Sequence, residues 1–282
     1  MGMSIATPEL EETPVGQGDP VLWTVAGEGV VQLTLNRPAS RNSLSEAVLA
    51  SLQQFINEVG RDTSVRAVVL AANGPVFCAG HDLKEMTARR SDDDRGRAYY
   101  EEILLQCGTL MQSIVRCPKP VLAAVQGTAT AAGCQLVATC DLAVASEDAR
   151  FCTPGVNIGL FCSTPMVALS RNVSRKRAME MLLLGELMSA AQAADYGLVN
   201  RVVPSDKVLA EAHSMAETIA AKSSVTVAIG KEAFYRQIEQ PLSEAYDFAA
   251  DVMVRNMLHR DAEEGIGAFL EKRPAKWNGP ES

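Results

Sequence analysis

The stretch that decides the fold reads KPVLAAVQGTATAAGCQL and runs from Lys119 to Leu136. Its apolar start, Val121–Val125, predicts a short buried strand. A turn of small residues follows, and a helix is expected from about Gly133. The first backbone N–H groups of such a helix have no partner within the helix, and they carry its partial positive charge. The stretch is therefore a strand–turn–helix unit with free donors at the turn.

A second unit of the same kind reads VFCAGHDLKE and covers residues 76–85. Two such turns side by side can bind a phosphate or polarise a carbonyl. Turns of small residues also serve as simple packing devices between a strand and a helix. Spacing alone leaves both interpretations open.

The segments on either side alternate between strand and helix patterns. Short strands are expected at 21–25, 30–35, 66–71, 142–145 and 198–203, and a helix at about 98–115. Capping boxes at 43–46 and 189–192 predict two helix starts, and Gly197 is expected just after a helix end. From 205 to 272 the periodicity is helical, with no strand signal.

This order predicts an α/β core with a helical region after it. We expect a flexible N-terminal arm at 1–20, a core at 21–204 and a C-terminal helical region at 205–282. A chain of 282 residues buries a large core, roughly three-quarters of its unfolded surface. Hydrophobic residues at 47% and charged residues at 21% exclude a disordered or collagen-like chain.

The charge balance bears on partners. With 26 Lys and Arg against 34 Asp and Glu, the net charge is −8. This argues against nucleic acid or an anionic membrane as the main partner, while leaving room for a local basic pocket that binds a phosphate.

The cysteines and the N-terminus bear on location. The seven cysteines are odd in number and have no metal-finger spacing, which predicts buried, reduced thiols. No Lys or Arg precedes Arg37, so neither a secretory nor a mitochondrial leader is recognised. No apolar run reaches the ~18 residues that cross a bilayer. We therefore expect a cytoplasmic protein.

Several common sites are excluded by their motifs. The second turn lacks the Gly-Lys-Ser/Thr ending of a phosphate loop, and no Gly-x-Ser-x-Gly elbow occurs. The histidines His81, His213 and His259 are too dispersed for a zinc site, so no metal is expected. A catalytic pair of Cys78 and His81, three residues apart, would need help from elsewhere in the chain.

Motifs along most of the chain resemble the crotonase superfamily, the enoyl-CoA hydratase/isomerase family. They are Leu35–Pro38 with Asn42, Phe77–Leu83, Lys119–Leu136, Cys140–Leu142, Ser189–Pro204 and Ala268–Arg273. The similarity spans about 21–273 in the family's order. It implies a spiral of repeated ββα units whose C-terminal helices build homotrimers, often paired into homohexamers.

The resemblance also implies a ligand, an acyl-CoA or enoyl-CoA thioester. By motif position, the thioester oxygen accepts hydrogen bonds from the backbone N–H groups of His81 and Ala132. A set of neighbouring positions lines the CoA and adenine pocket in the family: Ala79, Asp82, Leu83 and Lys84. Coenzyme A enters only as part of the substrate, so no permanently bound cofactor is expected. The imidazole of His81 departs from the family, and it either narrows the acyl pocket or is solvated.

Two further departures concern the reaction. Hydratases of this family hold and activate water with two glutamates, and here those positions are Gln135 and Gly155. Glutamine orients water but takes no proton at pH 7, and glycine offers no side chain. The segments Thr128–Leu136 and Thr153–Pro165 resemble a subgroup that carries the hydratase name by similarity.

Three functions therefore stay open. They are an enoyl-CoA hydratase, an isomerase or thioester hydrolase with a substitute base, and a non-catalytic acyl-CoA-binding regulatory protein. The candidates for a substitute base or polar group near the acyl pocket are Asp141, Asn157, Cys162, Ser163 and Thr164. Cys162 leads them because a thiol near a helix N-terminus can have a lowered pKa. Its alternative is a small buried hydrophobe. Asp141 also fits an ordinary strand start, and Ser163 or Thr164 a helix N-cap.

Overall fold

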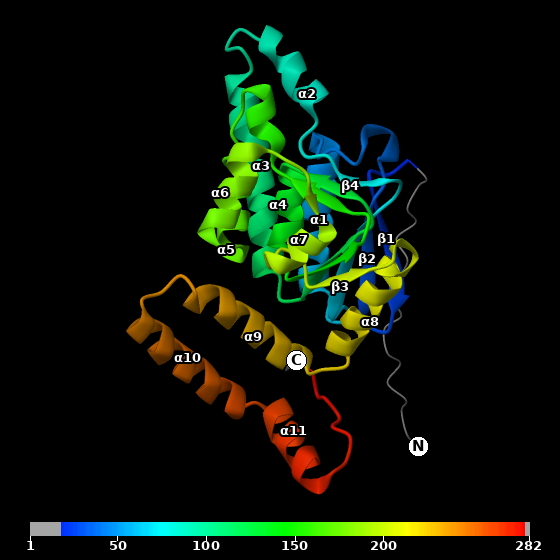
Figure 1. The fold of residues 1–282 in the computed structure, drawn as a ribbon. Coiled ribbons are helices and arrows are strands. Elements are labelled where there is room, and N and C mark those ends of the chain that lie inside the picture. The colour runs from blue at the N-terminus through cyan, green and yellow to red at the C-terminus, as the bar shows by residue number, and fades with distance from the viewer. Residues whose placement is uncertain (1–17, 280–282) are drawn as a thin grey trace.

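The computed structural model describes residues 18–279, and its core is a six-stranded sheet (Figure 1). The strands, in spatial order, are β1 (Val21–Gly27), β2 (Val30–Leu35), β3 (Ala67–Ala72), β5 (Val121–Val125), β7 (Leu142–Ser146) and β10 (Arg201–Val203). Only β1 runs antiparallel to its neighbour in this sheet. The central strands are apolar along their whole length because parallel sheets are covered on both faces.

A second sheet of four short strands lies beside the first. Its order is β4 (Val76–Cys78), β6 (Thr128–Thr130), β8 (Arg150–Cys152) and β9 (Met188–Ser189). Successive chain segments place one strand in each sheet, as β3 then β4, β5 then β6, and β7 then β8. Helices follow each pair, so the predicted spiral of ββα units is confirmed. Strands of two or three residues are too short to show alternation in a sequence.

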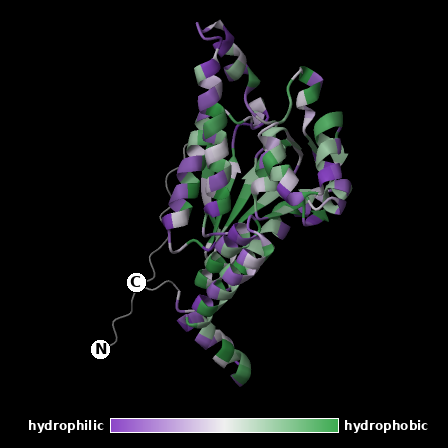
Figure 2. Cartoon of the chain, turned by 90° about the vertical axis from the view of Figure 1, so that its left-hand side faces the viewer, coloured by the Kyte–Doolittle hydropathy of each residue, from purple (hydrophilic) through white to green (hydrophobic). Residues whose placement is uncertain are grey.

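Helices cover both faces of the large sheet. Val31, Leu33 and Leu35 of β2 belong to the main core, with α1 (Glu46–Arg61), α3 (Arg97–Arg116) and α4 (Ala132–Thr139). Val30 points to the opposite face, where α8 (Val208–Ala220) packs through small residues such as Ala212 and Ala216. Figure 2 shows the resulting pattern, with hydrophobic strands inside and polar residues on the surrounding helices.

The remaining helices have the following bounds. They are α2 (Leu83–Ala88), α5 (Pro165–Asn172), α6 (Arg175–Leu184), α7 (Ala190–Asp195), α9 (Ser224–Gln237), α10 (Leu242–Met257) and α11 (Arg260–Glu271). Short 3-10 helices are η1 (Pro38–Ser40), η2 (Arg89–Ser91), η3 (Pro154–Ile158) and η4 (Ser205–Lys207). Within residues 18–279, no helix combines the length and apolar character needed to span a bilayer.

One of the two predicted capping boxes is confirmed. Ser189 and Gln192 cap α7 reciprocally, and Gly197 follows that helix with φ of +84°. The other prediction is wrong by two residues. Ser45 caps α1 by accepting from the Val48 amide at 3.3 Å, while the Ser43 hydroxyl donates to the Asp82 carboxylate at 2.8 Å. Ser43 therefore connects two loops instead of starting a helix.

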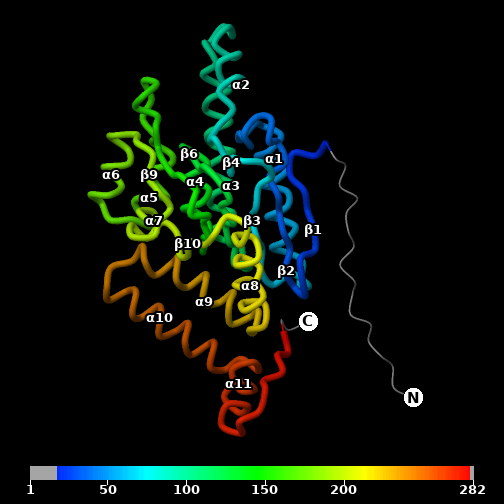
Figure 3. Tube along the Cα trace, turned by 45° about the vertical axis from the view of Figure 1, so that its right-hand side comes forward, coloured from blue at the N-terminus to red at the C-terminus, as the bar shows by residue number. Residues whose placement is uncertain are grey.

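The C-terminal helices α9, α10 and α11 form a separate layer beside the core (Figures 1 and 3). The helix before them, α8, packs on the sheet, so this layer begins at α9. Most of the arm expected at 1–20 falls outside the described residues. Large apolar side chains of the layer are exposed: Phe234, Ile238, Leu242, Tyr246, Met253, Val254, Met257, Leu258, Ile266, Phe269 and Leu270.

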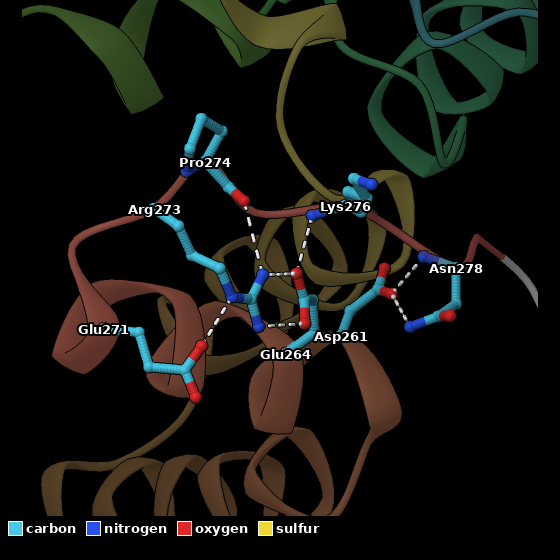
Figure 4. Close-up of polar contacts among 7 residues, drawn as sticks. All are labelled: Asp261, Glu264, Glu271, Arg273, Pro274, Lys276 and Asn278. Carbon is cyan, nitrogen blue, oxygen red and sulfur yellow. Dashed lines mark hydrogen bonds and ion pairs between the residues drawn. The ribbon is translucent and has the colours of Figure 1, made fainter.

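Hydrogen bonds and ion pairs hold the segment that follows α11 close to the start of α9. Arg273 binds both carboxylate oxygens of Glu264, at 2.6 and 2.9 Å, and Glu264 also accepts from the Lys276 amide (Figure 4). The buried Asp261 accepts from Asn278 and from the Ser223 hydroxyl, which precedes α9. These bonds hold residues 274–279 against the helices.

Candidate active site

The two turns singled out in the sequence lie in contact. Gly80 has φ of +88°, and a Cβ there would lie 3.2 Å from the Ala132 nitrogen and 3.1 Å from the Thr130 carbonyl oxygen. The Thr130 hydroxyl donates to the carbonyl of Ala79 at 3.0 Å. Figure 3 shows β4, β6 and α4 together in the middle of the molecule. A residue other than glycine at position 80 would therefore push the turns apart.

Close packing also fixes the start of α4. A Cβ on Gly133 would lie 2.2 Å from the carbonyl oxygen of Cys78, so the helix reaches β4 only with glycine there. Ala131, just before the helix, has φ of 49° and ψ of −119°, a backbone conformation that residues other than glycine rarely adopt. Its amide donates to the Cys152 carbonyl at 2.9 Å, which ties α4 to β8.

Two backbone amides remain free at this junction. Across residues 18–279, neither the His81 amide nor the Ala132 amide donates a hydrogen bond to the protein. The neighbours of His81 do bond, since Leu44 donates to the Gly80 carbonyl at 2.8 Å and Asp82 donates to the Leu44 carbonyl at 3.3 Å. The arrangement leaves two donors for an oxygen atom of a ligand.

The side chain of His81 is held without polar partners. Both ring nitrogens are shielded from solvent, and neither forms a hydrogen bond with the described chain. Burial lowers the pKa of His81, while the nearby Leu44 carbonyl acts in the opposite direction. Of the two alternatives for this imidazole, the solvated one is wrong. The ring is therefore neutral at pH 7.

The residues after His81 begin α2. The Asp82 carboxylate caps the helix by accepting from the amides of Lys84 and Glu85, at 2.9 and 3.3 Å. Burial acts to raise the pKa of Asp82, but bonds from Ser43 and these amides hold it below its usual range. Leu83 is half exposed and Lys84 is exposed. Ala79 is partly buried, and its amide donates to the Arg41 backbone carbonyl at 3.1 Å.

Gln135 and Gly155, the positions at which the motif resemblance predicts the family's two glutamates, differ in environment. Gln135, in the first turn of α4, is buried, and its Oε1 has no partner in the described residues. Gly155 lies in η3, where a Cβ would be 2.9 Å from Cys162 Sγ and 3.0 Å from the Leu160 carbonyl oxygen. The φ of Gly155 is not positive, so close packing and not backbone conformation restricts this position. Nearby Thr153 also has an unpartnered buried hydroxyl.

The proposed activation of Cys162 is wrong. Its thiol is buried, and burial raises its pKa, with a smaller opposite effect from a hydrogen bond to the Gly155 backbone. Burial also raises the pKa of Cys78 to about 12, which removes the Cys78 and His81 pair. All seven cysteines are buried and free, as predicted. Their thiols serve as packing groups here.

The polar candidates around Cys162 have structural partners. Asn157 donates to the Gly185 carbonyl at 3.2 Å, and Ser163 donates to the Phe161 carbonyl at 3.3 Å. Thr164 occupies the N-cap position of α5 and Pro165 the first helical position, but no side-chain bond caps the helix. These residues shape the loop and offer no base.

Asp141 is also a structural residue. Its carboxylate accepts from the Val121 amide at 2.7 Å, from Lys231 Nζ at 2.7 Å and from the Tyr235 hydroxyl at 2.9 Å. No local pattern predicts this network, because Lys231 and Tyr235 lie on α9, 90 and 94 residues further along the chain. Within residues 18–279, no group of three or more His, Cys, Asp or Glu side chains could hold a metal ion.

Comparison with known proteins agrees with this architecture. Residues 26–280 match the family described as enoyl-CoA hydratase/isomerase. The human protein named enoyl-CoA hydratase domain-containing protein 3, mitochondrial, is 46% identical over 251 residues, which cover 89% of this chain and 81% of that protein. The rat protein of that name is 47% identical over 251 residues, covering 89% of this chain and 82% of that protein.

Solved structures show the same likeness. A structure titled enoyl-CoA hydratase from Mycobacterium smegmatis is 54% identical with a TM-score of 0.88, over 92% of this chain and 98% of that chain. The structure of human enoyl-CoA hydratase domain-containing protein 3 is 46% identical with a TM-score of 0.87, over 92% of this chain and 100% of that chain. The resemblance inferred from the motifs is confirmed.

The comparisons overturn one expectation. The cytoplasmic location inferred from the acidic N-terminus is wrong, because the human and rat relatives are both named mitochondrial. That inference depended on the lack of Lys and Arg before Arg37. Residues 1–17 of that segment lie outside the described part of the chain.

Proposed function

Because the chain belongs to the enoyl-CoA hydratase/isomerase family, we propose that it binds an acyl-CoA or enoyl-CoA thioester and polarises its carbonyl. The donors are the backbone N–H groups of His81 and Ala132. The observation that carries the proposal is that both amides lack protein acceptors while their turns touch at Gly80. Fixed donors of this kind stabilise the negative charge that develops on the oxygen when an enolate forms.

The CoA part of the ligand lies along the turn that leads into α2. Ala79, Asp82, Leu83 and Lys84 provide this surface, and the exposed Leu83 and Lys84 side chains offer an apolar and a cationic contact. Coenzyme A arrives and leaves as part of the thioester, so the protein needs no permanently bound cofactor.

The reaction is enolate chemistry and not two-carboxylate hydration. Gln135 cannot take a proton, and the space beside Gly155 is filled by Cys162 and Leu160. Hydration of an enoyl-CoA is therefore slow. Isomerisation or thioester hydrolysis uses the same polarised carbonyl, and binding without turnover is the remaining alternative.

The assembly we propose is a homotrimer or a pair of trimers. Exposed apolar side chains on α9, α10 and α11 support it, since a monomer rarely leaves such a large apolar surface in water. Light scattering at micromolar concentration is expected to report a trimer or hexamer. A 30 kDa particle would contradict the assembly.

A carbonyl-stretch measurement tests the oxyanion site. A butyryl-CoA labelled with ¹³C at the thioester carbonyl should show a lowered stretching frequency when bound to the wild type. Ala132→Pro removes one donor, and losing such a donor costs about 2.7–4 kcal/mol of transition-state stabilisation. We expect that variant to lose much of the frequency shift.

A matched control uses the same substitution at another helix start. Ala190→Pro places proline at the first residue of α7, outside the two turns. It should leave the frequency shift intact, and circular dichroism checks that both variants fold. A bound carbonyl with an unshifted frequency in the wild type would reject the two-amide site.

A further inference from the structure

We propose that the His81 imidazole is the acid–base group of this site, transferring a proton at the acyl carbon next to the thioester carbonyl. The inference rests on the proposed function, because it requires a thioester held at the His81 and Ala132 amides. The proposed function uses only the backbone N–H of His81, and this inference adds a role for the His81 side chain.

The position of the ring carries the proposal. His81 lies in the turn that meets α4, one residue after Gly80 and paired with Leu44 in a short bridge. Both ring nitrogens are buried, and neither has a hydrogen-bond partner in residues 18–279. Buried polar atoms are normally paired, so two unpaired ring nitrogens on a residue whose own amide is free are available to a ligand. Because solvent does not reach the nitrogens, acyl binding has to turn the ring toward the substrate.

The other titratable side chains at the two turns are unsuited to act as a base, because they are either hard to ionise or committed to structural hydrogen bonds. The thiols of Cys78, Cys134 and Cys162 are buried, and burial raises the pKa of each. Asp82 is committed to capping α2 and to Ser43. Segment 128–139, which forms β6 and α4, contains no Asp, Glu, Lys or Arg. His81 is thus the side chain at this junction that can accept a proton near pH 7.

Burial, and no charged neighbour, is the main influence on the ionisation of the His81 ring. The charged residues on its own turn and on α2 are Asp82, Lys84 and Glu85. The Glu85 carboxylate accepts from the Glu46 amide at 3.1 Å. The loop before α1 contributes the exposed Arg41, and the first residue of α1 is the exposed Glu46, whose Oε1 lies 3.8 Å from Arg89 Nη2. Burial lowers the pKa of His81 and outweighs the Leu44 carbonyl. A neutral ring accepts a proton without first losing one.

The proton transfer balances without another reactant. The C–H bond next to the carbonyl breaks, its electron pair forms the enolate, and the negative charge rests on the thioester oxygen. The proton bonds to a ring nitrogen and makes an imidazolium. The reverse step returns a hydron from that nitrogen to the same carbon. In D₂O the imidazolium N–H exchanges with solvent once the ring has turned from its buried position, and the hydron returned after this exchange is a deuteron.

Deuterium exchange tests this step directly. Butyryl-CoA incubated with the full-length protein in D₂O should gain deuterium at C2, measured by proton NMR. His81→Gln keeps the backbone N–H but removes the base, and positioned acid–base groups contribute about 10²–10⁴-fold. We expect its exchange rate to fall at least about 100-fold. His213→Gln, on α8 away from the turns, is the control and should exchange at the wild-type rate.

Two further readouts separate the possible outcomes. The wild-type rate should fall as pH drops below the His81 pKa, and His81→Gln should lose this dependence. In His213→Gln/His259→Asn, His81 is the only histidine, and its ring resonances should shift when butyryl-CoA binds. Calorimetry on wild type and His81→Gln measures binding separately.

Binding without exchange in the wild type, or unchanged exchange in His81→Gln, would overturn the role of His81 while leaving the proposed function intact. Absence of acyl-CoA binding by the wild type would overturn both. Unshifted ring resonances with bound butyryl-CoA would also reject contact between the ring and the acyl group.

Discussion

Lys231 Nζ lies 2.7 Å from Asp141 Oδ2, and this buried ion pair joins α9 to the N-terminal edge of β7. Lys231 also donates to the carbonyls of Ile114 and Lys119, each at 3.0 Å, while Tyr235 donates to the other carboxylate oxygen. The ammonium thus has three acceptors with little access to water. The C-terminal layer is fixed to the core at this point.

Replacing Lys231 with Met should destabilise the protein strongly. It leaves the Asp141 carboxylate buried without its cation, and breaking one side of a buried pair costs about 3–5 kcal/mol. Urea unfolding followed by circular dichroism measures the loss. Tyr235→Phe removes one hydrogen bond to the same carboxylate and should cost about 1.5–3 kcal/mol. A Lys231→Met variant as stable as wild type would show that the pair contributes little to docking α9.

Glycine at position 131 should stabilise the fold. Ala131 has φ of 49° and ψ of −119°, and such strain costs on the order of 1–3 kcal/mol. Glycine relieves it but loses about 0.5–1 kcal/mol of chain entropy, so we expect a net gain of about 1 kcal/mol in unfolding free energy. Ala138→Gly within α4 is the control and should destabilise. A less stable Ala131→Gly would mean that the Ala131 methyl contact outweighs the strain.

The sequence predicts the large sheet and both turns, because apolar runs and small residues mark them directly. It fails for the second sheet, where strands such as β6 have three residues and no readable alternation. It also fails where a property depends on distant neighbours. Asp141 gains its ammonium partner from 90 residues further along the chain, and the pKa of Cys162 is set by burial that its local sequence does not show.

Acid should loosen the C-terminal segment through Asp261. Burial acts to raise the pKa of this carboxyl, but bonds from Ser223 and Asn278 lower it below its usual value. Because its pKa is lower in the folded state, the ionised Asp261 carboxylate stabilises the fold at pH values above its unfolded-state pKa, about 3.9. This stabilisation is lost as the pH falls through the folded-state pKa. Asp261→Asn should therefore show a flatter decline in stability below about pH 5.

Trp277 reports this change. Its indole donates to the Ala221 carbonyl at 2.8 Å, so its fluorescence follows release of residues 274–279. Asp251→Asn, an exposed carboxylate on α10, is the control and should keep the wild-type acid response. Equal slopes for wild type and Asp261→Asn would remove Asp261 from the acid transition.

Hydration of crotonyl-CoA should be slow in the wild type. Acid–base groups contribute about 10²–10⁴-fold, and the two glutamates act on one water as a unit, so their losses do not simply multiply. The two oxyanion donors that we propose would remain, and each such donor is worth about 10²–10³. Loss of the enoyl absorbance measures the rate. Turnover at about 1–10³ s⁻¹ would contradict the prediction and require a substitute base for water.

Restoring both carboxylates should raise that rate only if space is made for them. In Gln135→Glu/Gly155→Glu, the new Cβ at 155 meets Cys162 Sγ at 2.9 Å and the Leu160 carbonyl oxygen at 3.0 Å. Overpacking of this kind costs about 1–3 kcal/mol. Adding Cys162→Ala removes the sulfur contact, so the triple variant should be both more stable and faster than the double. Cys162→Ala alone, with no added carboxylate, should hydrate as slowly as wild type. If the triple variant folds but gains no activity, the backbone at Leu160 holds residue 155 out of reach of the water, and the loop itself bars the two-glutamate mechanism.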